Sequence, residues 1–258
     1  MTDEERFLFD LNGYLLIKNA VPADQVIEMN AYIDAQQDAD MAWRPQRGNA
    51  HVENPIKWGQ QFLDLMTLPS TYEVIDEICG PSVRLDHDYA IFLEPGHTGL
   101  VLHGKLTIPF DPIHYYYCFN NQIRCGLTVA TFALSDVPEG SGGLCVVPGS
   151  HKSNFQAPRD VRFMQRKADW VKHIPMKAGD CCIFTEALLH GTLPWDGPGE
   201  RRTLFYKYAP HGIAWEKSTY FPSDSISGLD ELIPTLTNKQ RALLSPPAAF
   251  DFYPKDHE

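Results

Sequence analysis

Residues 141–152 read SGGLCVVPGSHK, a glycine-rich turn followed by an apolar run of strand length. Glycines can form phosphate-binding loops, but this segment has neither the G-x-x-x-x-G-K-[ST] nor the G-x-G-x-x-G spacing. A tight turn between two strands explains the glycines better. The segment therefore predicts a strand over residues 143–147 that begins directly after a turn.

Short apolar runs of similar length lie on both sides of this strand. Gly, Pro and Asp separate them, and they cover residues 83–93, 100–102, 123–134, 143–147, 181–184 and 204–208. Runs of this kind predict an antiparallel sandwich or barrel and not alternating β-α-β units. We expect an all-β core over residues 83–210.

Helical patterns dominate residues 1–80, which we expect to flank this core. A strand over residues 13–18 is followed by a helix that begins near Pro22, and apolar residues then recur at helical spacing. Residues 45–55 are polar and aperiodic, which predicts a loop. A second helix is expected over residues 62–78, ended by a Gly-Pro pair.

The C-terminal residues 211–258 form a Pro-rich tail with one short helical pattern at residues 238–244. We expect this tail to wrap the surface. With neither an internal repeat nor a low-complexity tract, the chain of 258 residues is interpreted as one domain, residues 1–258.

Composition excludes several classes of partner. The formal net charge of −11 argues against nucleic acid or anionic lipid as the main partner, because both require a basic surface. The sequence contains no apolar run long enough to span a bilayer and no secretory signal. Its six cysteines include no C-x-x-C pair, so they are interpreted as reduced core residues of a cytoplasmic protein.

Two of the ten histidines have matching surroundings. His103 follows the apolar run 100–102, His190 follows the apolar run 183–189, and a glycine comes directly after each histidine. A histidine at the end of an apolar strand can point its imidazole into the mouth of a barrel, where metal ligands are common. We therefore take His103 and His190 as candidate metal ligands.

Three segments in the same order resemble the phytanoyl-CoA dioxygenase family. Residues 141–152 resemble its G-x-L-x-V-x-P-G-S-H-K signature, residues 9–24 its opening strand and helix, and residues 178–192 its distal-histidine strand. The resemblance implies a double-stranded β-helix, which is a cupin-like jelly roll with flanking helices. It also implies an oxygenase that uses Fe(II), 2-oxoglutarate and O₂, oxidises a C–H bond, and releases succinate and CO₂.

The resemblance also implies roles for particular residues. His190 corresponds to the distal metal ligand, and Arg201, eleven positions later, to the arginine that binds the distal carboxylate of 2-oxoglutarate. A planar guanidinium suits this role because it can donate two parallel hydrogen bonds to a carboxylate. Arg202 would point to the opposite face of a strand. Thr192 could add a hydroxyl contact to the co-substrate.

The proximal metal motif departs from the family pattern. His-x-Asp is expected, but Lys105 follows His103-Gly104, and an ammonium group has no lone pair for a metal. Asp111 or Glu186 could supply the carboxylate, the iron could be held by two histidines as in related halogenases, or metal binding could be lost. The segments LHG, FDP and FTEALLHGTLPW resemble a subgroup of phytanoyl-CoA dioxygenase-like sequences. This resemblance favours membership of a coherent subgroup over a damaged member of the family.

The sequence thus predicts an iron- and 2-oxoglutarate-dependent oxygenase acting on a small organic molecule, without naming that molecule. Halogenation or another radical outcome and a non-catalytic small-molecule-binding protein are the alternatives. Lys105 and Tyr116 are candidate substrate contacts, although the tyrosines at 115–117 would equally suit packing on a core. The oligomeric state is left open.

Overall fold

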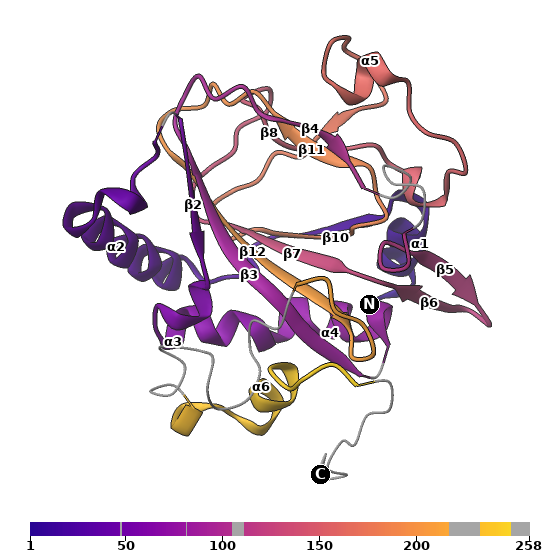
Figure 1. Cartoon of the computed structure of the whole chain (residues 1–258), viewed down its shortest axis with the longest axis horizontal. Helices are drawn as coiled ribbons and strands as arrows, with labels where there is room; N and C mark the ends of the chain where they lie inside the picture. The colour runs from indigo at the N-terminus through magenta and orange to yellow at the C-terminus, as the bar shows by residue number, and fades with distance from the viewer. Residues whose placement is uncertain (47, 81, 105–110, 217–232, 249–258) are drawn as a thin grey trace.

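The computed structural model describes residues 1–46, 48–80, 82–104, 111–216 and 233–248. Within these residues two antiparallel sheets face each other, and helices cover the outer side of the larger sheet (Figure 1). This arrangement confirms the predicted all-β core with flanking helices. None of the described helices is long and apolar enough to cross a membrane.

The larger sheet has six strands in the order β1-β10-β7-β12-β3-β2. Their bounds are β1 Tyr14–Ile17, β10 Cys181–Thr185, β7 Thr128–Ala133, β12 Arg201–Pro210, β3 Val83–Leu93 and β2 Asn49–Glu53. The N-terminal strand pairs with β10, about 165 residues later in the chain. The sheet order therefore places a strand from the N-terminal flank beside a strand from the second half of the core.

The smaller sheet has the order β4-β11-β8-β9, and a separate hairpin joins β5 to β6. Their bounds are β4 Leu100–His103, β11 His190–Leu193, β8 Gly143–Val146, β9 Lys172–His173, β5 Tyr116–Phe119 and β6 Gln122–Cys125. The strand predicted over residues 143–147 is β8. It is fully buried, which explains its unbroken apolar sequence.

The helices are α1 Asp3–Asn12, α2 Ala23–Ala39, α3 Gln60–Leu63, α4 Pro69–Cys79, α5 Arg159–Arg162 and α6 Asn238–Leu243. The first four lie in the predicted helical flank, and α6 coincides with the helix predicted in the tail. The sequence interpretation missed α1, whose start is marked by a capping box between Thr2 and Glu5. Its end is marked by Gly13 in the left-handed conformation.

Two predicted elements are wrong in detail. The loop expected over residues 45–55 contains β2, a polar strand at the edge of the sheet whose backbone pairs with β3. The helix expected over residues 62–78 is divided into α3, a 3₁₀ turn at Asp64–Thr67, and α4. Leu68 is extended because the following Pro69 disfavours a helical conformation at the preceding residue.

Alternation along β12 separates the helix-covered face from the interior between the sheets. Tyr206 and Tyr208 point to the helical side, where their hydroxyls donate to the carbonyls of Phe62 at 2.7 Å and Met66 at 3.0 Å. Side chains at odd positions of β12, from Arg201 to Lys207, face the other way. These odd positions contribute the polar groups of the interior.

Candidate active site

Strand pairing brings the two predicted histidines together. His103 ends β4, His190 begins β11, and the two residues are direct partners in the antiparallel ladder. Their ring centroids lie 4.2 Å apart. The prediction that His190 ends a strand over residues 183–189 is wrong, because β10 stops at Thr185 and a turn leads to His190.

The glycine after each histidine has a steric cause. A Cβ added to Gly104 would approach the Leu188 carbonyl oxygen to 2.5 Å, and Gly104 has a φ of +137°. A Cβ on Gly191 would meet the Leu100 carbonyl oxygen at 2.8 Å. Only glycine lets the two histidine-bearing strands approach this closely.

The two imidazoles are oriented by backbone carbonyls. The Nδ1 atom of His103 lies 3.0 Å from the Val101 carbonyl oxygen, and that of His190 lies 2.7 Å from the Leu188 carbonyl oxygen. A carbonyl only accepts, so each Nδ1 carries the hydrogen, and Nε2 is the nitrogen of each ring that can bind a metal. Burial lowers the pKa of His190 to about 3, so this ring is neutral near pH 7. A neutral imidazole in a fixed orientation, as at His190, is the form that binds a metal ion.

Glu186 is the carboxylate that reaches these histidines. It lies in the turn after β10, not on the strand that the sequence predicted, and is 3% exposed. One oxygen is 3.7 Å from His190 Nε2, and the other is 2.8 Å from Lys207 Nζ on β12. Burial opposes ionisation of Glu186, but the favourable interactions with Lys207, and with the nearby His190 and His103, together outweigh it and hold the pKa well below its ordinary value. Glu186 is therefore an anion, already paired with one cation.

Asp111, the other candidate carboxylate, is used locally. Its Oδ1 accepts from the backbone N–H groups of Ile113 at 3.1 Å and His114 at 2.8 Å. Its Oδ2 lies 2.6 Å from the Nδ1 atom of His114. Both acceptor oxygens of Asp111 thus have partners in their own turn.

Lys105 lies outside the described residues.

The donor set fits a divalent metal ion in part. Two ligands about 2.1 Å from one ion can be at most about 4.2 Å apart, and the gap between His190 and Glu186 is shorter than this. Within the described ranges, no three His, Cys, Asp or Glu side chains already form a complete metal cluster. The geometry thus provides two nitrogen ligands and one adjacent carboxylate whose second oxygen is bound by Lys207.

Arg201 carries a positive charge without an acidic partner in the described part of the chain. It is 3% exposed, and its buried Nε has no hydrogen-bond partner there. Its side chain reaches the smaller sheet, because a Cβ on Gly143 of β8 would lie 3.1 Å from Nε. Burial lowers the pKa of Arg201 to about 10, which leaves the guanidinium charged at neutral pH.

The neighbouring Arg202 faces the helical side, as strand alternation predicted. It pairs with Asp34 and Glu200, each at 2.6 Å, and donates to Asn30 on α2 at 3.0 Å. Two adjacent arginines therefore differ completely in surroundings. Arg202 is part of a structural network, and Arg201 is available to a ligand.

Two hydroxyls on the face of the larger sheet that also carries Arg201 were not predicted from the sequence. Thr203 lies two residues along β12, and Thr131 lies opposite Phe205 on the adjacent β7. Each is 1% exposed, and neither hydroxyl oxygen has a hydrogen-bond partner among the described residues. The even offset from Arg201 is the sequence signal that could have found Thr203.

Thr192 and Tyr116 have other surroundings. Thr192 is half-buried on β11, where it pairs with Leu144. The Tyr116 hydroxyl donates to Asp10 of α1, and the Tyr116 ring packs edge-on against His151. The Tyr116 side chain thus joins the hairpin to α1.

Comparison with known proteins finds a matching family and relatives in several animals. A model of the phytanoyl-CoA dioxygenase family matches residues 9–203. The peroxisomal phytanoyl-CoA dioxygenase of Rattus norvegicus is 24% identical over an alignment 240 positions long, which covers 80% of this chain and 66% of that protein. The Homo sapiens protein is 24% identical over an alignment 243 positions long, which covers 81% of this chain and 68% of that protein. This chain spans about two thirds of the length of these relatives.

Solved structures show the same fold. HygX from Streptomyces hygroscopicus, with nickel and 2-oxoglutarate bound, superposes with a TM-score of 0.75 at 20% identity, covering 84% of this chain and 90% of HygX. SnoK, an α-ketoglutarate-dependent carbocyclase from nogalamycin biosynthesis, gives a TM-score of 0.63 at 17% identity, covering 97% and 94%. The likeness confirms the predicted double-stranded β-helix.

Proposed function

This chain belongs to the phytanoyl-CoA dioxygenase family, and from that premise we propose that it is a non-haem iron, 2-oxoglutarate-dependent oxygenase acting on a small organic molecule. The observation that carries the proposal is the unpaired, buried guanidinium of Arg201, which lies between the same two sheets as the paired histidines. A buried cation without a partner is unfavourable until an anion binds it. A dicarboxylate co-substrate would supply that anion.

His103 and His190 would hold Fe(II) through their Nε2 atoms, and Glu186 would be the third ligand in place of the missing aspartate. With 2-oxoglutarate and O₂, the bound iron supplies the oxidation of a C–H bond. The main chain fixes both imidazoles, and Lys207 fixes the Glu186 carboxylate. These contacts keep the ligand atoms in place before any metal binds.

Arg201 would bind the distal carboxylate of 2-oxoglutarate, and the hydroxyls of Thr203 and Thr131 would donate further hydrogen bonds to it. This role explains three buried polar groups that otherwise have no partner among the described residues. We keep Thr192 as a further candidate for the co-substrate, and Lys105 and Tyr116 as candidates for the substrate.

The ion pair of Glu186 with Lys207 favours a second candidate, a two-histidine iron site of the halogenase type. If Lys207 keeps the carboxylate away from the metal, a halide could take the third position. An anaerobic crystal structure with Fe(II), 2-oxoglutarate and chloride distinguishes the two. We expect a Glu186 oxygen within about 2.2 Å of the iron. A halide in that position, with Glu186 more than about 4 Å away, would establish the second candidate instead.

The proposal is tested by anaerobic loading with Fe(II) and 2-oxoglutarate. We expect about one iron per chain and the weak visible charge-transfer absorption of the chelate. His103→Ala and His190→Ala should each abolish stoichiometric loading. His51→Ala is the matched control, because His51 lies on β2 and its side chain is 54% exposed. Unchanged iron content in both ligand variants would exclude the proposed site.

A further inference from the structure

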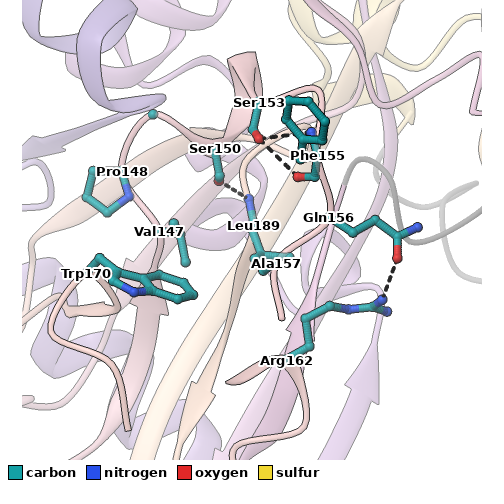
Figure 2. A pocket seen from close by; sticks show the side chains of 11 residues that line it. Val147, Pro148, Ser150, Ser153, Phe155, Gln156, Ala157, Arg162, Trp170 and Leu189 are labelled. Carbon is teal, nitrogen blue, oxygen red and sulfur yellow. Dashed lines mark hydrogen bonds between the residues drawn. The ribbon is translucent and has the colours of Figure 1, made fainter. Parts of the chain in front are cut away.

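A pocket of about 400 Å³ lies on the outer face of the smaller sheet (Figure 2). One wall is the segment after β8, and the other is the insertion that contains α5. Val147, Ala157 and Leu189 line it and pack with a cluster separate from the one that fills the space between the sheets. The pocket therefore lies behind the strand that carries His190 and not in front of it.

Aromatic side chains form an apolar part of this pocket. Trp170 and Phe155 both line it, and they are 40% and 86% exposed, respectively. The side chains of Val147, Ala157 and Leu189 add aliphatic surface beside them (Figure 2). Large exposed aromatic groups around a concave apolar surface are typical of a ligand site. The pocket thus suits a flat, apolar ligand body.

Arg162 adds a positive charge to the same pocket. One of its terminal nitrogens donates to Gln156 at 3.2 Å, whereas its buried Nε has no partner in the described part of the chain. Residues 152–172 contain six Lys and Arg against two Asp, in a protein with a net charge of −11. A locally basic segment on an acidic protein attracts anions. The charge therefore predicts an anionic end on the ligand.

We propose that this pocket is a second ligand site, which binds a small molecule with an aromatic body and one carboxylate. The site is linked to the backbone of His190. The Ser150 hydroxyl accepts from the Leu189 N–H at 2.7 Å, and the Val147 N–H donates to the Leu189 carbonyl at 2.8 Å. Ser150, Val147 and Leu189 all line the pocket, so its occupant touches the residues that position His190.

The test uses two probes of the same shape, naphthalene-1-acetate and the neutral naphthalene-1-acetamide, titrated calorimetrically into the full chain. We expect saturable binding of the acid with one site per chain. The amide should bind at least tenfold more weakly, because it lacks the charge that Arg162 attracts. Arg162→Gln and Trp170→Ala should each weaken binding of the acid at least tenfold.

Arg159→Gln is the matched control. It removes the same charge from the same short helix, and both arginines lie over the Phe163 ring, but Arg159 does not line the pocket. We expect near wild-type affinity for the acid in this variant. Binding should also persist in Arg201→Met, which separates this site from the co-substrate site. Equal binding of acid and amide, equal losses in Arg159→Gln and Arg162→Gln, or loss of binding in Arg201→Met would each overturn the proposal.

Discussion

Replacing Arg201 with methionine should make the ligand-free protein more stable. Burial lowers the pKa of Arg201 from 12.5 to about 10, and burial is the only cause of the shift. At about 1.4 kcal/mol for each tenfold change in an ionisation equilibrium, this corresponds to roughly 3 kcal/mol for holding the charge without a partner. Methionine keeps much of the apolar volume, so we expect the free energy of unfolding to rise by about 1–3 kcal/mol.

The same substitution should remove co-substrate binding. Truncating one partner of a buried charge pair costs about 2–5 kcal/mol, so 2-oxoglutarate should bind Fe(II)-loaded Arg201→Met roughly 30-fold to several thousandfold more weakly. Stability and binding thus move in opposite directions. If an arginine has a purely structural role, its replacement makes the protein less stable. We expect this for Arg202→Met, because the ion pairs of Arg202 with Asp34 and Glu200 contribute about 1 kcal/mol to stability.

Urea unfolding, followed by tryptophan fluorescence in the absence of metal and 2-oxoglutarate, measures the first effect. Anaerobic calorimetric titration of 2-oxoglutarate into the iron-loaded protein measures the second. Arg202→Met, which has the same change of side chain one residue away, should show lower stability with unchanged affinity. A destabilised Arg201→Met variant that still binds 2-oxoglutarate like the wild type would refute the reasoning.

Three further predictions concern other charged or reactive groups. Lys207→Met should lower the metal-free stability by about 3 kcal/mol, because Glu186 keeps a buried charge without its cation. Adding Glu186→Gln should recover most of this loss, measured by urea unfolding with a chelator present. A Lys207→Met variant as stable as the wild type would contradict the ion pair. Lys18 and two backbone N–H groups outweigh burial and lower the pKa of Asp180, so its contribution to stability is present above the unfolded pKa of about 3.9 and is lost as the pH falls through the lower folded value. Asp180→Asn should therefore destabilise at pH 7 and much less near pH 3, and an equal loss at both pH values would exclude this linkage. Cys118 is exposed and the five other cysteines are buried, so one thiol should react with Ellman's reagent in the native protein and six after unfolding; rapid reaction of two or more native thiols would disprove this burial pattern.

Local sequence was sufficient for the buried strands and for the opposite orientations of the two arginines. β8 and β10 are apolar along nearly their whole length because both of their faces are covered, so their sequences indicate strands without any neighbour. Side chains alternate along any strand, so Arg201 and Arg202 must face opposite ways. These features depend only on the chain itself.

The polar strand β2 shows where local sequence stops. Its polar residues predicted a loop, yet backbone hydrogen bonds to β3 make it an edge strand. Its side chains gain little from the sheet, so they carry little trace of it. Only the assembled sheet decides which segment of the chain pairs with its edge strand.

The site required the tertiary structure for the same reason. Glu186 was a candidate ligand on a wrongly predicted strand, and only the turn after β10 explains how it meets His190 and Lys207. Thr131 and Thr203 are ordinary strand threonines in the sequence, and become notable only because burial leaves their hydroxyls without partners among the described residues. Residue type and spacing determined which groups could perform chemistry. Distances across the two sheets, which arise from strand pairing far apart in the chain, decided which of these groups share one interior.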